Sequence, residues 1–324
     1  MKRIDALLRF GFLILLSLII LSMNPNFGKV GNLINILRQG SLLYILGIGM
    51  TIVILTGGID LSNGGVLALS SCVAAIAMEK GVPIIIAVII SLAIGMACGA
   101  ANGIMVAYTN IPPFIATFAM SYLARGLAYI FLHGRIIHGF EESFRSIAIE
   151  SIFGIPMPVV LSILLLFIFY LMLEHTPFGM NIYAIGSNIE SCRLAGIKTK
   201  KTIVMVYLLS GLLSAFAGLV YTARLNTAEP VIGASFPLDA IAAVVIGGTS
   251  LAGGEGSLFG TVIGVLILTI IINGMNMMGI SSLWQQFVTG SIILIMITIQ
   301  TYSKNVKLKN ISIFKKASGK SLNS

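Results

Sequence analysis

Three carboxylates stand close to glycine clusters in a chain that carries few charges. Asp60 lies in the segment TGGIDLSNGG that begins at Thr56, Glu255 lies in IGGTSLAGGEG from Ile246, and Asp239 precedes that second segment. A carboxylate near the membrane is costly unless it faces water or a polar partner, so all three are candidates for a functional role. The alternative for Asp60 and Glu255 is a wet loop in which they cap a helix.

The two glycine-rich segments share a pattern. Each follows an apolar run and precedes another, and each holds a Gly-Gly pair, a leucine four residues after its first glycine, and a second Gly-Gly pair. This indicates a weak internal repeat, of a kind that transporters place around a central path. No His/Asp or metal-ligand spacing points to an intramembrane enzyme.

A third candidate is the loop 174–202, the largest loop expected on the cytoplasmic side of the membrane. Ser187 or Asn188 can cap a short helix over 189–194, and Gly196 can end it in the left-handed conformation. A short helix that projects from a bundle suits docking into a groove on another protein. An ordinary interfacial connector is the alternative.

The elements that must position these residues are membrane helices. The chain has 324 residues, of which 57% are hydrophobic and 10% charged, and its mean hydropathy is +1.03. About 20 apolar residues suffice to cross a bilayer. We therefore predict an all-α, polytopic bundle with ten spans, of which the short ones at 64–78 and 238–249 are broken or re-entrant. The spans are expected at 6–23, 35–56, 64–78, 82–107, 114–132, 157–173, 203–223, 238–249, 257–274 and 283–301.

Charge predicts the orientation. The net charge is +9, but the basic residues lie between apolar runs rather than on one folded face, which argues against nucleic acid as a partner. With the N-terminus inside, thirteen Lys and Arg fall on the cytoplasmic side and six on the outer side, so the positive-inside rule favours both termini in the cytoplasm. The outer loop 133–156 is predicted to hold a short amphipathic helix.

Two series of glycines recur every four residues and would each line one helical face. Without side chains there, a neighbouring helix can approach closely, which predicts helix packing. The series are Gly95, Gly99 and Gly103, and Gly256, Gly260 and Gly264.

Several long segments together resemble the permease subunits of ribose-type monosaccharide ABC importers, and the likeness covers nearly all of the chain. They include VILTGGIDLSNGG from Val53, FIATFAMSYLARG from Phe114, YAIGSNIESCRLAGI from Tyr183, SGLLSAFAG from Ser210, ARLNTAEP from Ala223 and LDAIAAVVIGGTSLAGGEGSLFGT from Leu238.

The resemblance implies a multi-pass protein of the bacterial plasma membrane and a division of labour. A second permease subunit, identical or similar, would complete the path, a separate ATP-binding subunit would dock on the cytoplasmic side, and an extracytoplasmic sugar-binding protein would deliver the sugar. The chain itself would be no enzyme and need no cofactor. One permease domain over 1–303 and a basic cytoplasmic tail over 304–324 are expected.

The resemblance also assigns roles to residues. The coupling helix would use Asn188, Glu190, Arg193, Leu194, Ala195, Gly196 and Ile197. The path or gate would involve Thr56, Gly57, Gly58, Asp60, Ser62, Asn63, Asp239, Gly247, Gly248 and Thr249, because a neutral sugar calls for a polar and mostly uncharged lining. ATP binding would push the coupling helices and switch the opening of the path.

Other transport readings stay open. Asn63 and Gly64 stand where valine and glycine are common in the ribose pattern, so galactose, xylose or autoinducer-2 are alternatives to ribose. A permease for a nucleoside or a branched-chain amino acid is a further alternative. An ion-coupled carrier would need paired membrane carboxylates, for which Asp239 alone is a poor candidate.

Overall fold

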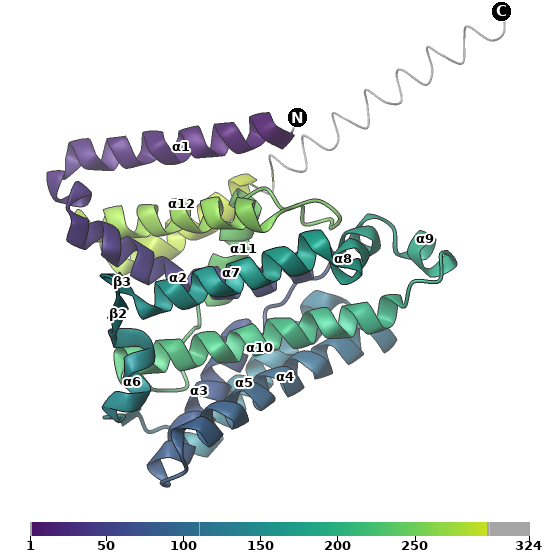
Figure 1. The fold of residues 1–324 in the computed structure, drawn as a ribbon, viewed down its shortest axis with the longest axis horizontal. Coiled ribbons are helices and arrows are strands. Elements are labelled where there is room, and N and C mark those ends of the chain that lie inside the picture. Colours follow the sequence, from purple (N-terminus) through teal and green to yellow (C-terminus); the bar gives the residue numbers. More distant parts are fainter. Residues whose placement is uncertain (1, 110, 297, 299–324) are drawn as a thin grey trace, which may run out of the picture.

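The computed structural model describes residues 2–109, 111–296 and 298, with side chains from residue 7, and within them the chain is almost entirely helical (Figure 1). The predicted tail 304–324 lies outside this range. The helices are α1 Lys2–Met23, η1 Pro25–Gly28, α2 Val30–Leu55, α3 Asn63–Glu79, α4 Ile84–Tyr108, α5 Pro113–Leu132, α6 Glu142–Ile149, α7 Met157–His175, α8 Pro177–Ser187, α9 Ile189–Leu194, α10 Thr199–Leu225, α11 Phe236–Ile246 and α12 Leu258–Met277, followed by a helix at Ser282–Met296. The strands are β1 Ile137–His138, β2 Ser151–Ile152, β3 Ile155–Pro156 and β4 Thr227–Ala228.

The prediction of a polytopic helical bundle is confirmed. Six helices, α2, α4, α5, α7, α10 and α12, are long and apolar enough to cross a membrane. Nine of the ten predicted ranges coincide with a helix, and the tenth, 283–301, overlaps the helix Ser282–Met296 but extends beyond the described residues. The helix α2 begins five residues earlier than predicted, α10 begins four residues earlier, and α11 ends at Ile246 rather than at 249. The loop 174–202 is mostly helical, because α8 and α9 occupy it.

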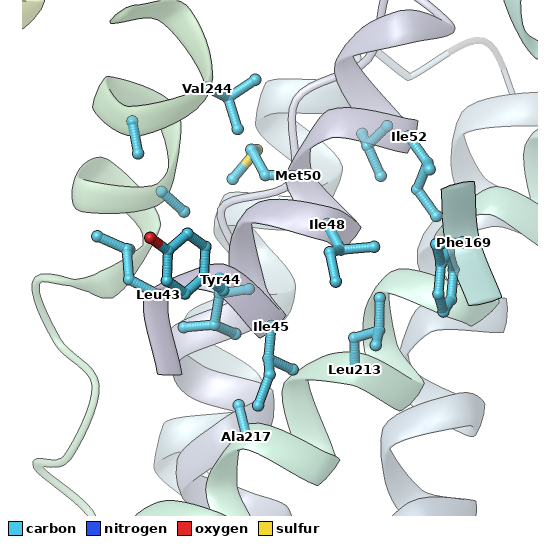
Figure 2. Packing of buried hydrophobic residues seen from close by; sticks show 14 of the residues in the cluster. Leu43, Tyr44, Ile45, Ile48, Met50, Ile52, Phe169, Leu213, Ala217 and Val244 are labelled. Atoms are coloured by element: carbon cyan, nitrogen blue, oxygen red, sulfur yellow. The ribbon is translucent and has the colours of Figure 1, made fainter. Parts of the chain in front are cut away.

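The central element is α2, which α7, α10, α11 and α12 surround. A helix that is apolar on all sides is buried, and every residue of α2 from Gly40 to Leu55 is buried. Figure 2 shows Ile52 facing Phe169 of α7. It also shows Met50 on the side of Val244 of α11.

The first glycine series forms the seam between α4 and α10. A Cβ on Gly95 would collide with the backbone of Gly211, and a Cβ on Gly99 with the backbone of Tyr207. The backbone of Val204 lies similarly close to Gly103. These glycines therefore allow the two backbones to touch, as predicted.

The second series forms a seam between α12 and α11. Cβ atoms on Gly260 and Gly264 would collide with the carbonyls of Gly247 and Ala243. Gly256 was expected on the same helical face, but it precedes α12 in a loop, because Ser257 caps the helix by accepting from the Gly260 amide at 3.1 Å.

The bundle has two different ends (Figure 1). The beginning of α1 lies at the same end as α8 and α9, whereas α6, β2 and β3 lie at the opposite end. The helix predicted within 133–156 is α6, and β1 in the same loop pairs with β4, so that Ile137 is opposite Ala228.

Candidate translocation and coupling site

The first glycine-rich segment separates α2 from α3, and we call its residues 56–62 the first break. Gly57 has φ +81°, a conformation that glycine adopts easily, and this ends α2. The Gly57 amide donates to the Ile54 carbonyl at 2.8 Å and the Gly58 amide to the Val53 carbonyl at 3.1 Å. Thr56, Gly57 and Gly58 thus form the turn that redirects the chain toward Asp60.

Asp60 is 1% exposed, so the alternative of a wet loop is wrong for this residue. Its Oδ1 accepts from the amide of Ser62 at 2.9 Å and from the hydroxyl of Ser62 at 2.6 Å. Its Oδ2 accepts from the Ser210 hydroxyl of α10 at 2.7 Å. Asn102 of α4 donates to the Ser62 hydroxyl at 2.8 Å, which extends the network. These hydrogen bonds satisfy a buried carboxylate that would otherwise be very costly.

Thr117 at the start of α5 holds the same break from another side. Its hydroxyl oxygen accepts from the Leu61 amide at 3.0 Å and lies 3.0 Å from the Ile59 carbonyl. The break is therefore attached to three helices, α4, α5 and α10, and has a defined conformation. Glu255, by contrast, is exposed, which agrees with the wet-loop alternative for that residue.

Asn63 is the first residue of α3 and is 1% exposed. Within the described part of the chain, neither atom of its side-chain amide has a hydrogen-bond partner. A buried amide without partners calls for an explanation such as a ligand or a water. Asn63 thus has hydrogen-bonding capacity that no described residue uses.

The beginnings of the two short helices meet beside Asn63. A Cβ on Gly64 would collide with the Gly233 carbonyl and lie 3.0 Å from Pro237 in the first turn of α11. Asp239 lies in the same turn and is partly buried. At 1.5 Å per residue, α11 is about 16 Å long, roughly half of the hydrocarbon thickness. The structure therefore brings Asn63 and the turn of Asp239 together at two interrupted helices.

The second glycine-rich segment follows α11, and we call its residues 247–256 the second break. Gly248 has φ +88°, and Thr249 is fully buried. Arg9 of α1 donates from Nη1 to the Gly247 carbonyl at 2.8 Å. A cation at the C-terminus of a helix is favourable because the carbonyls there carry partial negative charge. Sequence reasoning counted Arg9 only as a cytoplasmic charge and missed this contact, which joins residues 238 positions apart.

The two breaks touch each other. The Gly254 amide donates to the Leu55 carbonyl at 2.9 Å. A Cβ on Gly253, which has φ +84°, would lie 2.8 Å from the Gly57 amide nitrogen. The backbones of the two glycine-rich segments are thus in direct contact.

The end of α8 lies on this contact. A Cβ on Gly186 would collide with both the Leu55 carbonyl and the Gly254 amide. A Cβ on Gly254 would lie 2.5 Å from the Ser187 hydroxyl oxygen. We call Leu55, Gly57, Gly186, Gly253 and Gly254 the glycine junction. Sequence reasoning missed Gly186, although its place directly before the predicted coupling helix was a signal.

Tyr183, one turn earlier on α8, adds a side-chain contact to the second break. Its hydroxyl donates to the Gly256 carbonyl at 3.3 Å. Burial, and after it the nearby Glu174, raises the pKa of Tyr183 to about 12, so the phenol keeps its proton near neutral pH.

The short helix predicted over 189–194 is present as α9, immediately after α8. Asn188 caps it by accepting from the Ser191 amide at 2.9 Å, and Gly196 has φ +80° just after its end. Cys192 is buried, whereas Leu194 is 85% exposed. The helix is thus anchored on one side and presents an apolar side chain on the other. Glu190, Ala195 and Ile197, the other predicted docking residues, belong to α9 or the turn after it.

Arg193 and Glu190 form an ion pair on the exposed surface of α9. Arg193 Nη2 lies 3.0 Å from Glu190 Oε2, and both side chains are more than half exposed. Both remain accessible to a partner, because an exposed pair of this kind is held only weakly.

Comparison with known proteins gives relatives along nearly the whole chain. The ribose import permease protein of Escherichia coli strain K12 is 44% identical over 292 residues, 89% of this chain and 91% of that protein. The ribose import permease protein of Bacillus subtilis is 43% identical over 289 residues, 89% of this chain and 90% of that protein. The D-allose transport system permease protein of Escherichia coli strain K12 is 38% identical over 291 residues, 88% of this chain and 89% of that protein.

No solved structure matches the chain. Residues 32–297 match the family described as branched-chain amino acid transport system / permease component, and they include both glycine breaks, α8 and α9. The chain therefore belongs to this family of multi-pass membrane permeases.

Proposed function

We propose that this chain is the permease subunit of an ATP-driven importer for ribose or a similar monosaccharide. The relatives support a sugar as the solute, since they are permeases named for ribose and D-allose. A path that crosses the bilayer would be completed by a second permease subunit. An extracytoplasmic binding protein would supply the sugar, and a separate ATPase subunit would supply the energy.

Ten membrane crossings with both termini in the cytoplasm complete this proposal. The end of the bundle that carries α9 also carries Arg193, Lys198, Lys200 and Lys201, and the positive-inside rule assigns such an end to the cytoplasm. The opposite end, with α6, would then face the binding protein.

The sugar path is proposed to pass the beginnings of α3 and α11. The unpartnered amide of Asn63 supports this position, because an amide can both donate to and accept from sugar hydroxyls. Asp239 stands in the neighbouring turn. Ser62 and Asp60 have their hydrogen bonds satisfied internally, so we assign them to holding the start of α3 in place rather than to contact with the sugar.

Coupling is proposed to run from α9 through α8 to the glycine junction. The single observation that carries this mechanism is the contact of Gly186 with both breaks at once. The ATPase would push on the exposed face of α9, and α8 would transmit the displacement to Leu55 and Gly254. Leu55 precedes α3 and Gly254 follows α11. Their movement would therefore shift both short helices, at whose beginnings the path is proposed to pass.

Reconstitution tests this function. The purified chain and an ATP-binding subunit are reconstituted into liposomes, a sugar-binding protein is added, and accumulation of radiolabelled ribose, D-allose and leucine is measured. We expect accumulation of a monosaccharide that depends on ATP and on both partners. Accumulation of leucine alone would favour the branched-chain amino acid alternative. Transport by this chain alone, driven by an ion gradient, would contradict an importer and favour a carrier.

A further inference from the structure

A cavity of about 370 Å³ lies between α1, α11, α12 and the helix Ser282–Met296. Its walls include Phe12, Ile246, Ile271 and Ile295, and of the described residues that line it only Arg9 has a polar side chain. Phe12 and Ile295 are more than half exposed, so the cavity is open at the surface of the bundle. An apolar molecule or chain is the suitable occupant.

Arg9 gives this cavity a charged end. One of its five N–H bonds is used, from Nη1 to the Gly247 carbonyl at 2.8 Å. No other hydrogen bond or ion pair of this side chain is present among the described residues. A guanidinium in this state can bind a phosphate through its remaining N–H groups, for which its planar geometry is well suited.

The surroundings identify the occupant. The outside of a membrane bundle faces lipid, and a phospholipid joins an apolar chain to a phosphate, the combination that this cavity and Arg9 match. In the sequence, Lys2 and Arg3 precede the cavity residues of α1, and six lysines follow Met296. Such basic clusters next to membrane helices attract anionic lipids.

We propose that the cavity binds one acyl chain of an anionic phospholipid, with the lipid phosphate on Arg9. The bound phosphate would hold Arg9 in place against Gly247, and thereby hold α1 against the end of α11. This proposal depends on membrane residence and not on the identity of the transported solute.

Native mass spectrometry of the full-length chain in detergent tests the site. Phosphatidylglycerol and diacylglycerol, which has the same acyl chains but no phosphate, are added in equal amounts, and the retained lipid is counted. We expect the wild type to prefer phosphatidylglycerol by about tenfold, the strength of a charge-assisted hydrogen bond to phosphate. Arg9→Gln should remove the preference and Arg9→Lys should keep part of it. Equal preference in wild type and Arg9→Gln would overturn the assignment of the phosphate.

Filling the cavity tests the place of the acyl chain. Ile271→Trp should abolish retention of phosphatidylglycerol, and Leu8→Trp at the rim provides a second variant if Ile271→Trp does not fold. The matched control Ile163→Trp changes a residue of α7 that is 56% exposed, and should leave retention unchanged. Undiminished retention in a folded cavity variant would overturn the proposal. So would a shift from dimer to monomer in that variant without loss of lipid, which would assign the cavity to a second copy of the chain.

Discussion

Asp60 is a buried carboxylate that hydroxyl and amide donors stabilise in place of a cation. Ser62 and Ser210 provide three hydrogen bonds to its two oxygens, and Asn102 supports Ser62. A charge held in this way is attached to two other helices at once. We therefore interpret Asp60 as the residue that keeps the start of α3 at a fixed position.

Replacing Asp60 by leucine should destabilise the protein. The substitution keeps the size of the side chain but leaves buried donors of Ser62 and Ser210 without an acceptor, at about 1–3 kcal/mol for each unpaired group. We expect a lower thermal midpoint in detergent, measured by the loss of the monodisperse chromatographic peak after heating. Asp60→Asn should have a smaller effect, because an amide oxygen remains.

The matched control for this substitution is Glu142→Leu, which removes an exposed carboxylate from α6. It should change the free energy of unfolding by no more than about 0.5 kcal/mol, as surface substitutions do, and so leave the midpoint close to that of wild type. Equal midpoints for Asp60→Leu and Glu142→Leu would mean that the network around Asp60 contributes nothing to stability.

Sequence reasoning found Asp60 but not its partners, for a physical reason. A charged residue inside an apolar context is visible in the sequence because of its cost. Ser210 is 150 positions away, and one serine among many carries no sign of the carboxylate that it contacts. Arg9 was missed for the same reason: its charge was visible, whereas its acceptor is a backbone carbonyl, which every residue has.

At the scale of elements, local signals predicted helices well and contacts between them poorly. The cap at Asn188 and the stop at Gly196 act within one helical turn, so α9 could be predicted from its own residues. The glycine junction depends on how α2, α8 and the second break come together. Nothing in the sequence around Gly186 specifies that its partners are Leu55 and Gly254.

Gly186→Ala should interrupt coupling. The added Cβ would collide with the Leu55 carbonyl and the Gly254 amide, so α8 must move away from both breaks. Overpacking of this kind costs about 1–3 kcal/mol. We expect at least about fivefold slower uptake at an unchanged amount of protein in the membrane, measured with radiolabelled ribose in cells and by immunoblot.

Gly126→Ala is the control for the junction. Gly126 is also in a helix, but a Cβ there would meet nothing within 4 Å, so uptake should equal that of wild type. If Gly186→Ala transports as fast as Gly126→Ala, the junction does not transmit the movement of α8.

At the scale of the whole molecule, the arrangement of the two ends makes a prediction about orientation. In a variant without Cys72, Cys98 and Cys192, a single cysteine is placed at exposed Ser143 of α6 or at exposed Ser187 of α8. A membrane-impermeant maleimide should label Ser143→Cys in intact cells and Ser187→Cys only after permeabilisation. Labelling of Ser187→Cys in intact cells would reverse the orientation and with it the assignment of α9 to the ATPase.

The last prediction joins that orientation to function through Arg193. Its pair with Glu190 is more than half exposed and contributes little to folding, so Arg193→Glu should leave the chain stable and in the membrane. A negative charge in the docking surface should nevertheless abolish uptake and prevent co-purification of the ATPase. Lys80→Glu makes the same change of charge at an exposed residue just after α3, at the end proposed to be outside, and should keep both properties. If Arg193→Glu transports like Lys80→Glu, the ATPase does not dock at α9, and the proposed transmission of movement from α9 through α8 is wrong.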